Sequence, residues 1–181
     1  MNRDLHNSIT LVLKFLWIFT LIIIVWQALW SYYILPERMV SHFDESGNPD
    51  GWSSKSSFML LWYITILILQ LVWLIPLLLM RLSLKKLPVW MINVPNKDYW
   101  FSNEERKEEC ARRMNTMVLG IAFLMNFTMI LLYQSIVRGN LEPDKKINIW
   151  VVFISLGFMF LFTFAYLFTA FRKPKTDKTD K

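Results

Sequence analysis

Four stretches of the chain contain no Asp, Glu, Lys or Arg, and each is long enough to cross a membrane. Each has at least 22 residues, and together they cover residues 15–36, 56–80, 114–137 and 147–171. A bilayer core of about 30 Å needs about 20 helical residues, and a spanning segment in lipid must satisfy its own backbone hydrogen bonds. The sequence therefore predicts an all-α fold, a polytopic membrane protein with four transmembrane helices.

The predicted helices divide the chain into four parts. Residues 1–80 form a helical hairpin whose two helices are joined by a polar loop at 35–56. Residues 81–113 form a connection with an interfacial segment and a charged helix, and residues 114–171 form a second helical hairpin. The charged, low-complexity tail at 172–181 is expected to be disordered, because it has too few apolar residues to pack.

Lys and Arg gather on one side of this arrangement. The N-terminal segment, the connection and the tail hold 15 of the 20 basic residues, and the other two loops hold five. The positive-inside rule therefore predicts a multi-pass cell-membrane protein with both termini cytoplasmic and the loop at 35–56 facing outwards. Basic residues beside the helices that span the lipid bilayer explain the net charge of +6, so the charge does not indicate a nucleic-acid partner.

The single cysteine, Cys110, excludes an intramolecular disulfide and a multi-cysteine zinc site. It belongs to the predicted cytoplasmic connection. We therefore expect its thiol to react only with membrane-permeant reagents in intact cells.

The loop at 35–56 holds the densest run of turn-forming residues. Pro36 ends the first helix, because the residue before a proline is disfavoured in a helix. Gly47 and Gly51 permit positive φ, and the run that contains Pro49, Asn48-Pro49-Asp50-Gly51, is a strong turn signal. The sequence predicts a compact loop braced by these turns.

The same loop carries an imidazole and three carboxylates within nine residues, from His42, Asp44, Glu45 and Asp50. Such a set can ligate a divalent ion, but the spacing matches no standard metal motif, so we predict no metal and no cofactor. In a structural interpretation the aspartates accept backbone hydrogen bonds within the turns. In a binding interpretation, a partner is recognised by the loop side chains His42, Phe43, Asp44, Asp50 and Trp52.

The predicted connection has two readings as well. Lys97, Tyr99 and Trp100 suit a cytoplasmic interfacial anchor, with a positive charge on anionic headgroups and aromatic rings at their depth. A docking site for a cytoplasmic protein is the alternative. Ser102 and Glu105 form a capping-box pattern, which predicts that a charged helix starts near residue 103 and continues into the third span.

The loop resembles the motif of the DUF1648 membrane proteins, which also opens the immunity protein family directed against the sporulation-delaying toxin of Gram-positive bacteria. The residues that carry the resemblance are LPER at 35–38, HFD at 42–44, Gly47, PDGW at 49–52 and Lys55. The resemblance covers the first helix, the loop and the start of the second helix. It implies a helical membrane fold and a role in peptide-toxin immunity. The immunity proteins carry further spans, so the fold transfers more strongly than the function.

The predicted spans contain no His, Asp or Glu, which argues against an intramembrane enzyme and against active transport. Their amides, on Gln27, Gln70, Asn126 and Gln134, line a polar path or hydrogen-bond between helices. Two hypotheses follow. One is a non-enzymatic envelope protein whose loop recognises a secreted peptide or envelope ligand, for immunity or sensing. The other is a structural or accessory subunit that packs against a larger transporter or signalling protein, or against its own copies.

Overall fold

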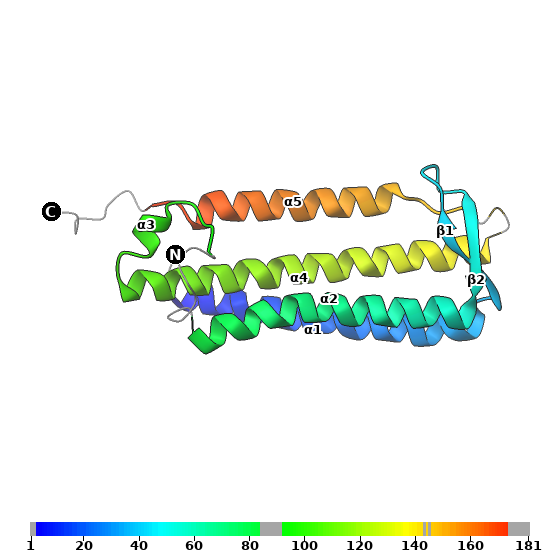
Figure 1. Ribbon diagram of the computed structural model, residues 1–181, viewed down its shortest axis with the longest axis horizontal. Helices are drawn as coiled ribbons and strands as arrows, with labels where there is room; N and C mark the ends of the chain where they lie inside the picture. The colour runs from blue at the N-terminus through cyan, green and yellow to red at the C-terminus, as the bar shows by residue number, and fades with distance from the viewer. Residues whose placement is uncertain (1–2, 84–91, 143, 145, 174–181) are drawn as a thin grey trace.

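The computed structural model describes residues 3–83, 92–142, 144 and 146–173, and it contains four long helices, one short helix and a β-hairpin (Figure 1). In chain order they are α1 (Arg3–Ile34), β1 (Arg38–Phe43), β2 (Pro49–Ser54), α2 (Lys55–Ser83), α3 (Lys97–Trp100), α4 (Glu104–Leu141) and α5 (Trp150–Ala170). The long helices α1, α2, α4 and α5 are each long and apolar enough to cross a membrane. The predicted four-span membrane fold is confirmed.

The molecule has two distinct ends (Figure 1). The β-hairpin lies at one end, and α1 begins and α5 finishes at the other. We call these the hairpin end and the termini end. The side of the membrane that each end faces, and the boundaries of the predicted domains, remain predictions. The predicted disordered tail lies outside the described residues from residue 174 onwards.

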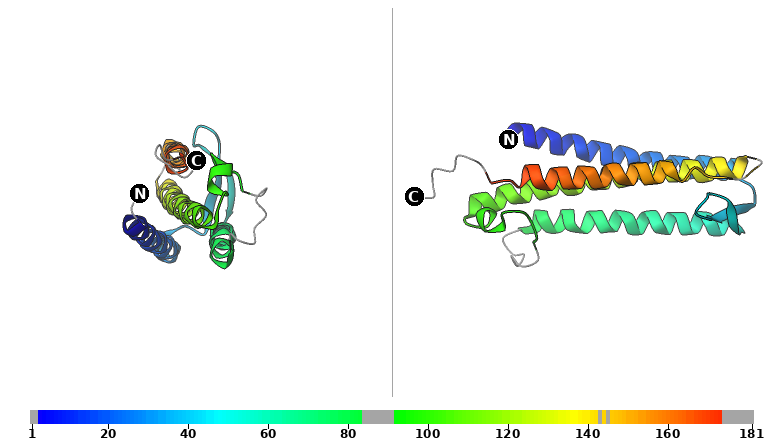
Figure 2. Two further views of the ribbon diagram at one scale, coloured as in Figure 1. Left: turned by 90° about the vertical axis from the view of Figure 1, so that its left-hand side faces the viewer. Right: turned by 90° about the horizontal axis from the view of Figure 1, so that it is seen from above.

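Helix α4 is the centre of the bundle. It lies between α5 on one side and the pair α1 and α2 on the other (Figures 1 and 2), and it contacts all three. In its most apolar window 44% of the residues are buried inside the protein, against 6% for α5. The exposed side chains of α5 include Phe153, Phe158, Phe164 and Phe168. A bilayer rather than water is the solvent that suits such a surface.

Polar side chains join α4 to its neighbours within the bundle. The indole Nε1 of Trp17 donates to Gln70 Oε1 at 3.0 Å, and Gln70 Nε2 donates to Asn126 Oδ1 at 2.8 Å. Asn126 Nδ2 donates in turn to the hydroxyl of Thr20 at 3.3 Å. This network links α1, α2 and α4, and it shows Gln70 and Asn126 in the interhelical role that was one of the two predicted for the amides. Lipid supplies no competing hydrogen bonds there.

Two further contacts fix α1 on α4, one near each end. The hydroxyls of Thr10 and Thr116 lie 2.8 Å apart near the termini end. Near the hairpin end the hydroxyl of Ser31 lies 2.6 Å from that of Tyr133, whose ring packs against Phe58 and Trp62. Tyr133, Phe58 and Trp62 belong to a cluster of buried apolar residues that includes Met39 of β1, so the hairpin shares the core of the bundle.

Two helices extend further than the uncharged windows predicted. Helix α1 begins at Arg3, twelve residues before its window, and α4 begins at Glu104, ten residues before its own. With 32 and 38 residues they are about 48 and 57 Å long, more than a bilayer core requires. The charged helix does run straight into the third span. Its cap is Asn103, whose side chain accepts from the Arg106 N–H, so the predicted Ser102 cap is wrong by one residue.

The orientation can be tested with thiol reagents, although not through the native cysteine. Cys110 is 0% exposed, so its thiol is shielded from reagents of either kind, and its predicted reaction with permeant reagents only stays a prediction. Glu105 and Glu45 are exposed, at the termini end and the hairpin end respectively. In a Cys110→Ser background in intact cells, Glu45→Cys should react with an impermeant maleimide and Glu105→Cys only with a permeant one. The opposite pattern would reverse the predicted orientation.

Candidate binding site at the hairpin end

The predicted compact loop is a two-stranded antiparallel hairpin, an element that the sequence analysis did not predict. Arg38 of β1 is opposite Ser54 of β2, and Phe43 is opposite Pro49 at the other end of the ladder. The register is interrupted on both sides of His42. Residues 44–48 connect the strands. A hairpin of this size is marginally stable alone in water, so its order depends on what it packs against.

The connection is held by the carboxylate of Asp44. Its Oδ1 accepts from the backbone N–H groups of Ser46 and Asn48, both at 2.8 Å, and its Oδ2 accepts from Asn48 Nδ2 at 3.0 Å. The side-chain and backbone hydrogen bonds from Asn48 hold the pKa of Asp44 below its usual value. The turn therefore keeps its acceptor at neutral pH and loses it only as pH falls through this lowered pKa. The structural interpretation is confirmed for Asp44.

The two glycines of the loop have different roles. Gly47 adopts φ 80°, as predicted, and its carbonyl accepts from the Ile147 N–H at 3.1 Å. Gly51 lies within β2 opposite His42 and has no positive φ, so its predicted turn role is wrong. A Cβ at position 51 would lie 2.7 Å from the Cβ of His42, so glycine is needed there for the close approach of the strands.

The other predicted binding residues lie on the hairpin itself. His42 Nδ1 pairs with Asp50 Oδ1 at 2.5 Å across the strands, with side chains that are 73% and 44% exposed. The guanidinium of Arg38 lies 5.7 Å from the ring centre of Trp52, while Phe43 is half-buried. Within the described part of the chain, no group of three or more His, Cys, Asp or Glu is placed to hold a metal ion.

A single asparagine fastens the hairpin to α4. Asn140 is 4% exposed; its Oδ1 accepts from the Val40 N–H at 2.7 Å, and its Nδ2 donates to the Val40 carbonyl at 3.1 Å. The side chain thus bonds both backbone groups of one β1 residue, as a neighbouring strand would. We call this the Asn140 contact. It satisfies two backbone groups that would otherwise be buried without a partner.

Lys55 fastens the base of the hairpin to α1. Its Nζ donates to the Leu35 carbonyl at 3.2 Å, forms an ion pair with Glu37 at 2.7 Å, and lies 4.8 Å from the ring centre of Tyr32. The residue is only 8% exposed, so its ammonium is held by these groups rather than by water. The leucine, glutamate and lysine of the LPER…K motif therefore act together at one point of the structure.

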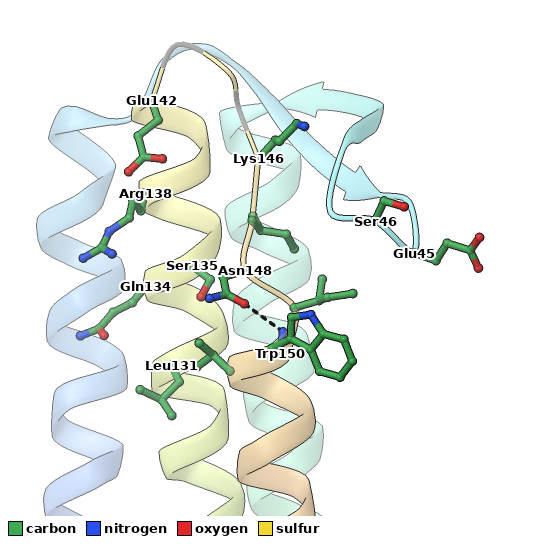
Figure 3. Close-up of a pocket in the computed structure, with 13 residues that line it drawn as sticks. Glu45, Ser46, Leu131, Gln134, Ser135, Arg138, Glu142, Lys146, Asn148 and Trp150 are labelled. Atoms are coloured by element: carbon green, nitrogen blue, oxygen red, sulfur yellow. Dashed lines mark hydrogen bonds between the residues drawn. The ribbon is translucent and has the colours of Figure 1, made fainter.

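A cleft of about 800 Å³ opens beside the hairpin turn. Four parts of the chain line it (Figure 3): the turn, the last three turns of α4, the connection that leads into α5, and the start of α5. Its charged side chains have both signs, and its apolar side chains come from α4, from the connection and from the start of α5. The residues that line the cleft include Glu45, Gln134, Arg138, Lys146, Ile147 and Trp150. We call this the hairpin cleft.

The second predicted site lies at the opposite end of the bundle. Trp100 is 2% exposed, and its indole N–H donates to the Phe171 carbonyl at 3.1 Å, with the Arg113 guanidinium 4.7 Å from its ring centre. Its predicted place at the lipid interface is therefore wrong, because the ring is buried against the end of α5. Lys97 and Tyr99 are half-buried, and their interfacial role stays a prediction.

Several residues of the hairpin end escaped the sequence analysis. Asn140 and Arg138 fall in the stretch RGNLEPDKK, whose composition is typical of a turn, although α4 continues to Leu141. Lys146 and Ile147 follow in the connection. The available signal was the position of these residues, directly after the third uncharged window and facing the loop at the same end of the predicted bundle.

The fold and this site define an integral membrane protein with four spans and a hairpin fastened to the central helix. Residues 17–68 match the family model of a domain of unknown function, DUF1648, so the predicted resemblance to the DUF1648 proteins is confirmed over this region, and the relation to the immunity proteins stays a prediction. The match covers the second half of α1, the whole hairpin and the first half of α2. Comparisons with curated proteins and with solved structures found no match.

The turn can be tested by glycine substitution. A Cβ at Gly47 would fall on the carbonyl oxygen of Ile147, and the positive φ disfavours any L side chain, whereas a Cβ at Gly157 of α5 meets nothing. Gly47→Ala should destabilise the hairpin turn by about 1–3 kcal/mol and speed its cleavage in limited proteolysis. Gly157→Ala should leave both unchanged. Equal cleavage rates in the two variants would contradict the described turn.

Proposed function

We propose that the protein is a non-enzymatic membrane receptor of the bacterial envelope, in which the hairpin and the hairpin cleft bind a secreted peptide or envelope ligand. The observation that carries this proposal is the attachment of the hairpin to the bundle on three sides. The Asn140 contact, Lys55 and the Gly47–Ile147 hydrogen bond each join it to a different element. A binding loop held in one conformation loses less entropy when a ligand binds.

The cleft beside the turn supports an amphipathic ligand. Arg138 and Lys146 offer donors to carboxylates, Glu45 offers an acceptor to amines, and Trp150 supplies an apolar contact surface. A cleft of about 800 Å³ is in the range of small-ligand sites and accepts a few residues of a peptide. The charge distribution of the loops favours an outward position for this end.

Two further points favour immunity or sensing over chemistry. The His42–Asp50 pair is open to water, whereas an enzyme holds such a pair around a sheltered substrate. The motif at 35–55 also resembles the one that opens the immunity protein family. Of the two receptor functions we therefore propose peptide-toxin immunity first and sensing of an envelope ligand second.

An accessory role in a larger membrane complex is the second candidate. The observation that favours it is α5, which packs on α4 and leaves most of its apolar surface exposed, including Phe153 and Phe164. A partner helix or a second copy of this chain would cover that surface. In this case the contacts that matter lie along α5 in the membrane and not at the hairpin.

The receptor proposal is tested by sensitivity to secreted peptides. Deletion of the gene should change the sensitivity of the cell to at least one peptide of a panel, and His42→Ala or Trp52→Ala should reproduce the deletion. Trp26→Ala is the matched control, because Trp26 is also an exposed tryptophan but lies on the apolar surface of α1. It should behave as the wild type.

A photo-cross-linker distinguishes the two candidates in the same cells. Placed at Gln134 in the hairpin cleft, it should capture the peptide, and placed at Phe164 on α5 it should not. Unchanged sensitivity across the panel, with capture of a membrane protein from Phe164 alone, would reject the receptor and favour the accessory role.

A further inference from the structure

A second pocket lies at the termini end, between the first turns of α1 and the charged part of α4. It has a volume of about 250 Å³, and its polar lining comes from both helices: His6, Asn7 and Lys14 of α1, and Arg112 and Asn115 of α4. We call it the α1–α4 pocket. The bond between the hydroxyls of Thr10 and Thr116 holds the two helices together there.

The depth of the pocket in the bilayer follows from the sequence. Lys14 directly precedes the uncharged window of α1, and Arg112 stands two residues before that of α4. Both cations therefore lie where the hydrocarbon core gives way to the headgroups. Beside them α1 exposes Leu11 and Phe15, whose side chains are 55% and 66% exposed. Acyl chains are the natural neighbours of these two residues.

The lining is basic and has donors to spare. Lys14 forms no ion pair with any residue that the structure describes, and no described carboxylate lines the pocket. Arg112 binds Glu109 through Nε at 3.0 Å and Nη2 at 2.7 Å. Its Nη1 has no hydrogen-bond partner among the described residues. The guanidinium can therefore keep its ion pair and still donate to a ligand.

His6 supplies an independent observation. The residue is 3% exposed, and its Nε2 lies 3.0 Å from the hydroxyl of Thr116. Its other ring nitrogen, Nδ1, is buried without a hydrogen-bond partner in the described part of the chain. Buried polar atoms nearly always have a partner, so an unmatched one that belongs to a pocket residue indicates a missing ligand group.

We propose that the α1–α4 pocket binds the phosphate of an anionic phospholipid in the leaflet at the termini end. Phosphate oxygens accept from the Lys14 ammonium, the Arg112 guanidinium and the amides of Asn7 and Asn115, and His6 donates through Nδ1. The acyl chains then lie on the exposed apolar side of α1. Free phosphate has the same oxygen chemistry but makes no use of that apolar surface. This site is independent of the hairpin and of the proposed function.

The test measures lipid binding to the purified full-length protein in a zwitterionic detergent, by native mass spectrometry. Phosphatidylglycerol, phosphatidylcholine and inorganic phosphate are titrated separately. Lys14→Gln and Arg112→Gln should each weaken phosphatidylglycerol binding about tenfold, the effect of one lost charge-assisted hydrogen bond. Lys107→Gln is the matched control, because Lys107 pairs with Glu104 on the same helix outside the pocket. It should bind as the wild type.

The three titrations distinguish binding of a phospholipid from binding of free phosphate. Binding of phosphatidylglycerol that inorganic phosphate does not displace supports the lipid. Lys14→Gln should fold as the wild type, because Lys14 has no ion pair with any described residue. Three results would overturn the proposal. These are equal binding of phosphatidylcholine, an equal loss in Lys107→Gln, and binding of inorganic phosphate alone.

Discussion

The Asn140 contact is the interaction on which the candidate binding site depends. A two-stranded hairpin has too little core to stay ordered by itself. Here one buried amide of α4 bonds both backbone groups of Val40, and the apolar face of β1 enters the core of the bundle through Met39. The hairpin thereby becomes an extension of the membrane helices. The geometry of the cleft beside its turn is fixed by the same helix.

The central position of α4 follows from the way in which helices associate in lipid. Apolar side chains gain little by leaving lipid for each other, so helices in a bilayer associate through close packing and hydrogen bonds. Nearly all the hydrogen bonds between long helices described above end on α4, at Thr116, Asn126 and Tyr133, and Asn140 of the same helix bonds the hairpin. Helix α5 meets α4 mainly through apolar contacts, and the carbonyls at its C-terminal end accept from Trp100 of α3 and Arg113 of α4. The polar residues of α4 therefore assemble the bundle at four levels.

The spans were predictable because lipid excludes charge over a fixed length, and that rule acts on local sequence. The motif loop was predictable as a compact element because its turn-forming residues are also a feature of the local sequence. Its strands were not, because pairing depends on partners in α4 and on the fit of Gly51 against His42. Asn140 was missed because its neighbours look like a turn, and Trp100 was misplaced because its partner Phe171 is distant in the sequence. Local composition carries no information about such contacts.

Hydrogen–deuterium exchange of the Val40 amide tests the central claim most directly, in the full-length protein reconstituted in lipid nanodiscs. The wild type should exchange this amide slowly, because Asn140 accepts its N–H in a buried site. Asn140→Leu should speed the exchange about tenfold or more without changing α2, since one hydrogen bond is lost and two buried groups are left unpaired. Gln134→Leu, on the exposed side of the same helix, should have no effect at Val40. Fast exchange in the wild type, or equal exchange in all three proteins, would contradict the account.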